Sequence, residues 1–100
     1  MVAGICQTIR HPARRLTYQE ACDLAGRAES TGSAAGVLID LRETRDTTVG
    51  ALARLVVLRR DLLRRGCDLR ITGLCGRARI LYEVNHLAAL LPSAGETAAG

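Results

Sequence analysis

Short apolar runs alternate along the chain with longer segments in which apolar residues recur every three or four positions. The short runs predict three strands, at residues 2–9, 36–41 and 68–72. The run at 36–41 is apolar on both faces and is bounded by turn-forming residues, which is typical of a central strand covered by helices. The run at 68–72 alternates polar and apolar residues, which indicates a strand nearer an edge.

The longer segments predict three helices, at residues 17–30, 47–65 and 76–85. Thr17 and Glu20 fit a capping box at the start of the first helix. Gly66 follows the second helix in the position where glycine commonly ends helices. The alternation of strands and helices predicts an α/β fold with helices packed against a central sheet. The first strand is free to pair antiparallel at an edge, so we expect the sheet to be mixed.

The long helix carries more apolar residues than one sheet face needs. Its inner stripe is expected to consist of Val49, Leu52, Val56 and Leu63. The arc is widened by residues that we expect to form a contact surface, namely Leu55, Leu58 and Leu62. The stem of Arg59 is expected to lie along this arc with its guanidinium in solvent. In the other helices, the residues expected to face inward are Tyr18, Ala21, Cys22, Ala25 and Ala28, and Ile80, Leu81, Val84 and Leu87.

A chain of 100 residues has the size of one domain. We assign residues 1–92 to that domain and the small, polar residues 93–100 to a flexible C-terminal tail. The chain has two tyrosines and neither phenylalanine nor tryptophan, so its core must be aliphatic.

All fourteen basic residues are arginine, and the formal net charge is +4. A basic field attracts anionic partners, which keeps an arginine-driven nucleic-acid-binding domain among the interpretations. The arginines are scattered, however, and no aromatic residues are interleaved with them to stack on bases. We therefore favour a protein partner over nucleic acid.

The thiols and histidines lack the spacing of a metal or redox site, so we expect no cofactor. The cysteines, none of them in a CxxC pair, are Cys6, Cys22, Cys67 and Cys75. The N-terminal residues do not resemble a signal peptide, and no apolar run is long enough to span a membrane. We expect a soluble cytoplasmic protein with reduced thiols and no disulfide.

The sequence contains none of the common catalytic motifs, such as GxSxG, GxxxxGK[ST], GxGxxG or HExxH. Asp40 ends the central strand, where α/β folds often place active residues, but a turn or capping role is the simpler interpretation. His11 and His86 are expected to be structural. We therefore expect that the protein is not an enzyme.

Three pieces in a fixed order carry a resemblance to a known family. They are Val-Leu-Ile-Asp-Leu at 37–41, Asp-Thr-Thr-Val-Gly-Ala-Leu at 46–52, and Leu-Arg-Arg-Asp-Leu-Leu-Arg-Arg-Gly at 58–66. This order resembles the STAS domain of bacterial anti-sigma factor antagonists, and the resemblance covers residues 37–92. It implies a STAS-like α/β domain that works in signalling and transcription regulation. The implied partner is a histidine-kinase-like anti-sigma factor, docked through the N-terminus of the long helix.

In that family a hydroxyl at the start of the long helix is the phosphorylation switch. The resemblance implies that Thr47 is the candidate phospho-acceptor, with Thr48 as the alternative. Helix N-termini have unpaired N–H groups and favour anions, and Arg42 and Arg45 are candidates to pair with a phosphate. We expect these residues and Asp46 to bind the partner, and Asp46, Thr47 and Thr48 to lie at the surface. A plain N-cap role for either threonine stays open.

The turn departs from the family pattern in two ways. The link from Leu41 to Gly50 is shorter than usual, and Thr48 and Val49 replace the typical Ser-Gly pair. When the family pattern is aligned backwards from Gly50, Asp46 takes the position of the phospho-acceptor. The site would then carry a permanent negative charge and could not be switched by phosphorylation.

The same resemblance implies an alternative function. A small STAS subunit accompanies the ATPase of the bacterial phospholipid-trafficking transporter, and it too carries an Asp-Thr pair at this turn. The partner is therefore either an anti-sigma factor or a transporter ATPase, and a homo-oligomer is left open.

Overall fold

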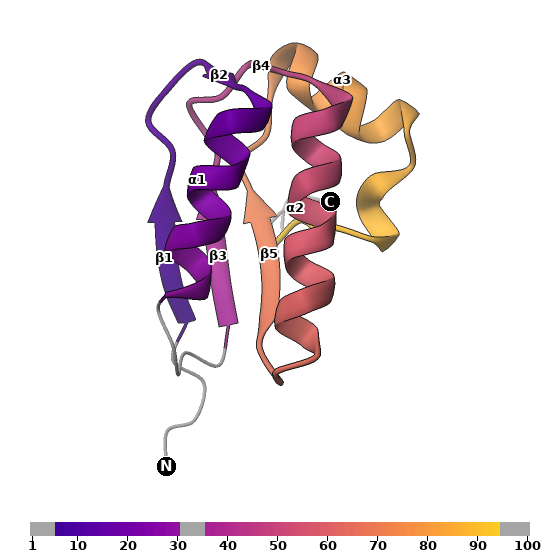
Figure 1. The fold of residues 1–100 in the computed structure, drawn as a ribbon. Coiled ribbons are helices and arrows are strands. Elements are labelled where there is room, and N and C mark those ends of the chain that lie inside the picture. Colours follow the sequence, from indigo (N-terminus) through magenta and orange to yellow (C-terminus); the bar gives the residue numbers. More distant parts are fainter. Residues whose placement is uncertain (1–5, 31–35, 95–100) are drawn as a thin grey trace.

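The computed structural model describes residues 6–30 and 36–94, and it confirms the α/β class. Strands β1 (Cys6–Arg10), β3 (Gly36–Asp40) and β5 (Asp68–Thr72) form a sheet with β3 in the centre. Helices α1 (Tyr18–Glu29) and α2 (Val49–Leu63) lie side by side on one face of this sheet (Figure 1). Helix α3 (Gly76–Val84) and the 3₁₀ turn η1 (Leu87–Ala89) lie beyond β5.

The expectation of an antiparallel first strand and a mixed sheet is wrong for the described strands. β1 pairs parallel with β3, with Cys6 opposite Gly36 and Arg10 opposite Asp40. β3 pairs parallel with β5 in the same way. The physical reason is the connection: α1 crosses from the end of β1 back to the start of β3, and such a helical crossover places consecutive strands in parallel.

Two further strands of two residues each were not predicted from the sequence. They are β2 (Arg15–Leu16) and β4 (Asp46–Thr47), which pair parallel with each other. Each precedes a helix at the end of the molecule where the three long strands finish (Figure 1). A strand of two residues is too short to produce a readable periodicity.

The core lies between the sheet and the helices and is almost wholly aliphatic, as expected. The capping box of α1 is present: Glu20 N donates to Thr17 Oγ1 at 3.1 Å, and Thr17 N donates to Glu20 Oε1 at 3.0 Å. Gly66, with φ of 81°, occupies the left-handed conformation just after α2, where glycine avoids strain. Cys22, Cys67 and Cys75 form no disulfide.

The buried face of α2 is rotated from the expected one. Its buried residues are Ala51, Leu52, Leu55, Leu58 and Leu62. Val49 and Leu63, expected inside, are 47% and 45% exposed. The prediction of Leu55, Leu58 and Leu62 as a contact surface is therefore wrong. Both sets have helical spacing, so periodicity does not decide which arc meets the sheet, and the larger leucine side chains fill the space above it.

The inner faces of the other two helices are partly as expected. In α3, Ala78 and Tyr82 are buried, whereas Ile80 and Val84 are 59% and 61% exposed. Tyr82 is accommodated in the core because its hydroxyl donates to Leu91 O at 2.7 Å. Tyr18, expected inside, is 55% exposed at the start of α1.

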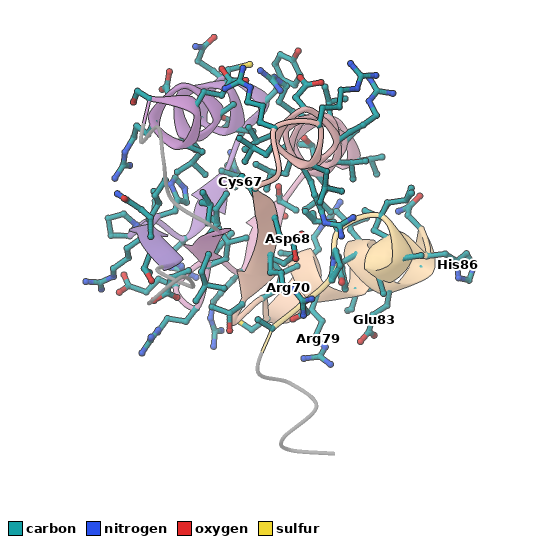
Figure 2. All side chains as sticks on the ribbon, turned by 90° about the horizontal axis from the view of Figure 1, so that it is seen from below. Cys67, Asp68, Arg70, Arg79, Glu83 and His86 are labelled. Carbon is teal, nitrogen blue, oxygen red and sulfur yellow. The ribbon has the colours of Figure 1, made fainter. Side chains whose placement is uncertain are left out.

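The sheet face away from α1 and α2 is not covered by these helices. Figure 2 shows Asp68 and Arg70 of β5, and Arg79 and Glu83 of α3, with Arg79 and Glu83 directed away from that helical layer. Arg70 Nε donates to Asp68 Oδ2 at 3.1 Å. Charge pairing, not apolar packing, thus characterises this side of β5.

Arg59 does not place its guanidinium freely in solvent as expected. Its Nε donates to Asp68 Oδ1 at 3.2 Å and to Leu69 O at 3.1 Å, and its Nη1 donates to Leu90 O at 3.4 Å. The side chain is only 19% exposed. Arg59 therefore joins α2 to β5 and to the segment after η1.

The predicted tail is ordered against the sheet at its beginning. Ser93 pairs with Ile71 in a parallel bridge, and Ala94 N donates to Ile71 O at 2.8 Å. The first two residues of the predicted tail thus bond to β5, and residues 95–100 lie outside the described part of the chain, so the flexibility of the tail stays a prediction. None of the helices in the described ranges is long and apolar enough to cross a membrane.

Candidate functional site

The predicted site lies at the end of the sheet where the long strands finish. The loop from Leu41 to Thr48 crosses this end, and α1, α2 and α3 all begin there (Figure 1). The carboxyl ends of parallel strands are the usual position of binding sites in α/β folds.

Asp40 shapes the first turn of this loop, as its expected turn role requires. Its Oδ1 accepts from Arg42 N at 3.0 Å, and its two oxygens accept from Arg42 Nε at 3.1 and 3.0 Å. The side-chain hydrogen bond from Arg42, with the arginine's charge, holds the pKa of the buried Asp40 carboxyl below its ordinary value of about 3.8. Arg42 is therefore engaged within the loop, although its side chain is exposed.

The loop is fastened to the segment before α1. Thr44, fully buried, donates its hydroxyl to Ala13 O at 3.1 Å. Arg45 N and Asp46 N both donate to Arg14 O, at 2.8 and 3.0 Å. These bonds hold the loop against the segment before α1.

The loop also packs tightly on the start of α3. A Cβ on Gly73, with φ of 85°, would lie 2.7 Å from the backbone of Arg42. A Cβ on Gly76, with φ of 60°, would lie 3.0 Å from Arg45 O. Glycine is needed at both positions for its positive φ and for the close approach.

Thr47, the predicted acceptor, is not at the surface. It is 4% exposed, and its hydroxyl donates to Leu16 O at 2.8 Å. The reason is the β2–β4 pairing, which turns the Thr47 side chain inward and leaves that of Thr48 outside. Thr48 is exposed and is the N-cap of α2, where its Oγ1 accepts from Ala51 N at 3.0 Å.

The charges at this end have a positive balance. Its arginines are Arg10, Arg14, Arg15, Arg42, Arg45 and Arg77, and its carboxylates are Glu20, Asp40, Glu43 and Asp46. Asp46, half-buried, lies 3.6 Å from Arg15 and 3.4 Å from Arg77, and Glu43 pairs with Arg10. Within residues 6–30 and 36–94, no carboxylate lies within 4.0 Å of the exposed Arg14 and Arg45.

Sequence reasoning missed an exposed apolar patch beside Thr48. A Cβ on Gly50 would lie 4.0 Å from Tyr18 Cδ1, so the Tyr18 ring stands next to the first turn of α2. Val49 adjoins it and is 47% exposed. We call the exposed side chains of Tyr18, Thr48 and Val49 the Tyr18–Thr48 surface. Arg45 is also exposed at this end of the molecule, but it contacts Gly76 and Ala78 at the start of α3. The only signal of the Tyr18–Thr48 surface in the sequence is that both apolar members directly follow an N-cap threonine.

The described residues contain no group of three or more histidine, cysteine, aspartate or glutamate side chains that could hold a metal ion. The predicted site residues divide into two sets. Arg45 and Thr48 are each exposed, whereas Arg42, Asp46 and Thr47 are bound into the loop and its neighbours.

The fold is shared with a solved structure, the crystal structure of a sulfate transporter family protein from Wolinella succinogenes. The TM-score is 0.69 at 14% sequence identity, over 85% of this chain and 70% of that chain. No family model matches the chain, and no curated protein does. At this identity the likeness concerns the fold alone, which is of the STAS type, as the sequence resemblance implied.

Proposed function

We propose that this chain is a non-enzymatic interaction module that docks a protein partner through the Tyr18–Thr48 surface. The observation that carries the proposal is the exposed Tyr18 ring standing beside Gly50, Val49 and Thr48. Tyrosine and arginine are the residue types that most often dominate binding energy at protein interfaces. Here the tyrosine stands beside the first turn of α2, and the exposed Arg14 and Arg45 lie at the same end of the molecule.

The electrostatics of this surface favour an acidic region on the partner. No acidic residue lies in the first turn of α2, whose N-terminus carries a positive partial charge. Asp46, two residues before the N-cap, lies within 4.0 Å of Arg15 and Arg77. Arg14 and Arg45 add two guanidinium groups with no carboxylate within 4.0 Å among the described residues. A partner carboxylate near Arg45 would therefore meet a positive charge that is not already paired.

We propose Thr48, and not Thr47, as the site of regulation by phosphorylation. The Thr47 hydroxyl is buried and donates to Leu16 O, whereas the Thr48 hydroxyl is exposed. A phosphate on Thr48 would bring about −1.5 to −2 charges to the surface that favours an acidic partner. That charge would oppose docking. Asp46 is held by Arg15 and Arg77, which supports a role in fixing the loop.

Two partner classes are proposed on the basis of the sequence resemblance. One is an anti-sigma factor of the histidine-kinase-like type. The other is a transporter component such as an ATPase, and it is supported by the sulfate transporter family protein that shares this fold. Both would be docked by the same surface, so identification of the bound protein separates them.

The test is affinity capture with tagged protein from a native lysate, followed by quantitative mass spectrometry. We expect Tyr18→Ala to reduce the captured partner at least tenfold, because truncation of a central aromatic residue costs about 2 kcal/mol or more. Arg27→Ala, an exposed change in the last turn of the same helix, is the matched control and should capture normally. Equal capture by wild type and Tyr18→Ala would contradict the proposal.

A further inference from the structure

Three apolar residues of α2 form a line on its outer side. Val49, Val56 and Leu63 are each seven residues apart, which is nearly two helical turns and places them along one stripe. Val49 and Leu63 are 47% and 45% exposed, and Val56 is partly buried against the core. Ala53 and Val57 are exposed beside them. We call these five residues the α2 line.

Apart from Val56, the α2 line is not required by the core. Five other residues of α2 already cover the sheet, and they are buried with at most 3% exposure. Single exposed apolar residues are ordinary, but a stripe of several along one helix is typical of a binding face. The stripe extends about 21 Å, the rise of fourteen residues, which matches a partner helix of four turns.

The charges beside the α2 line are basic. Arg60 is exposed, and no carboxylate lies within 4.0 Å of it among the described residues. The Arg64 side chain is 70% exposed and only approaches Asp61, at 3.9 Å. Asp61 is the one carboxylate in α2. Arg60 is four residues after Val56 and three before Leu63, so it lies within the same outer arc as the line. A helix that lies along the line would therefore meet an excess of positive charge there.

We propose that the α2 line binds an amphipathic helix of the partner in which acidic residues flank an apolar stripe. This inference rests on the proposed function, because the line begins at Val49, a member of the Tyr18–Thr48 surface. It adds the type of structure that the partner presents and extends the interface to the far end of α2. The apolar stripe supplies the buried area, and the acidic flank pairs with Arg60 and Arg64.

A second copy of this chain is a poorer occupant on grounds of charge. An antiparallel pairing of two α2 helices centred on Val56 would place Arg60 level with Leu52 and Arg64 level with Thr48, where α2 offers no carboxylate. A parallel pairing would set Arg60 against its own copy. Like charges at close range oppose association, whereas an acidic helix satisfies both arginines.

The test uses two synthetic peptides as probes, each about 18 residues long and with the same leucine stripe. One peptide carries glutamates beside the stripe and the other lysines. Fluorescence anisotropy with the full chain should show the glutamate peptide binding at least tenfold more tightly, with affinity falling as salt rises. Leu63→Glu should weaken that binding at least tenfold, and Arg60→Glu with Arg64→Glu should remove the preference. Ile80→Glu, at an exposed apolar position on α3, is the control and should bind normally.

Three results would overturn the inference: no binding of either peptide, equal binding of both, or a dimer of the protein alone that Leu63→Glu dissociates. Circular dichroism of each variant excludes unfolding as the cause. The failure of this inference is distinguishable from failure of the proposed function. If Tyr18→Ala loses the captured partner while Leu63→Glu changes neither capture nor peptide binding, the Tyr18–Thr48 surface remains the docking site. The proposal that the α2 line binds an acidic helix then fails. If the peptide binds as expected but Tyr18→Ala captures normally, the proposed docking site fails.

Discussion

The hydroxyl of Thr47 donates a hydrogen bond to the backbone oxygen of Leu16, 2.8 Å away. This bond joins β4 to β2 and places Thr47 inside, while the next residue, Thr48, caps α2 from outside. Two adjacent threonines at the start of one helix therefore have opposite roles. One holds the loop, and the other is available at the surface.

We expect the two threonines to respond differently to the same substitution. Thr47→Glu places a carboxylate in a site with 4% exposure and removes the donor to Leu16 O, so it should destabilise the fold by about 3 kcal/mol or more. Thr48→Glu puts a negative charge at an exposed helix N-terminus and should change stability by less than about 1 kcal/mol. Thermal unfolding of both variants measures this. Similar melting temperatures would contradict the assignment.

Arg59 and its neighbour Arg60 offer a second matched pair. Arg59→Ala removes the bonds to Asp68 and to the Leu69 and Leu90 carbonyls, and should lower the free energy of unfolding by about 1–3 kcal/mol. Arg60→Ala removes an exposed side chain and should stay within about 0.5 kcal/mol of wild type. Urea unfolding compares the two. Equal losses would show that the Arg59 contacts do not contribute to stability.

Two glycines should respond to alanine with opposite signs. Gly73→Ala would place a Cβ 2.7 Å from the Arg42 backbone at a φ of 85°, so it should destabilise by about 1–3 kcal/mol and displace the loop. Gly26→Ala adds a methyl group with nothing within 4 Å inside α1, and should stabilise by about 0.5–1 kcal/mol. Chemical denaturation tests both. A neutral Gly73→Ala would mean that the loop does not pack on this glycine.

The Asp40–Arg42 pair should make stability depend on pH in the acid range. The pKa of Asp40 is lowered in the folded state, chiefly by the Arg42 hydrogen bond, so folding favours the ionised carboxylate. Its stabilising contribution is complete above the ordinary pKa of about 3.8 and is lost as the pH falls through the lower folded-state value. We therefore expect Asp40→Asn to lose stability relative to wild type at neutral pH, and this difference to shrink in acid. A difference independent of pH would contradict the pairing.

The features that the sequence predicted correctly are those that can be read from short segments of the chain. The Thr17–Glu20 capping box forms as expected because it joins residues only three apart. The strand Asp68–Thr72 has the expected bounds because its alternation of polar and apolar residues can be read locally, although its partner β3 is distant in the sequence. The burial of Thr47 depends instead on Leu16, 31 residues earlier in the chain. A pairing of two-residue strands across that distance has no periodicity to reveal it.

The face of α2 could not be read from the sequence for a related reason. Val49, Val56 and Leu63 and the buried Leu55, Leu58 and Leu62 have equally good helical spacing. Which set is buried depends on where the sheet lies. The sequence shows that α2 has more apolar residues than the core needs. However, Val49 and Leu63, which were expected to be buried, are exposed. Arg59 was correctly expected on the same side of α2 as Leu55, Leu58 and Leu62. Its partners, Asp68 and Leu69, belong to β5 and could not be predicted from the pattern of the helix.

The central claim is that a protein partner docks on the Tyr18–Thr48 surface, and photo-crosslinking in the cell tests it most directly. A photoreactive phenylalanine analogue at Tyr18 is compared with the same analogue at Asp23, an exposed position further along α1. We expect one dominant crosslinked protein from position 18 and none of it from position 23. Its identity by mass spectrometry would separate an anti-sigma factor from a transporter component. Equal crosslinking from both positions, or none from position 18, would contradict the claim.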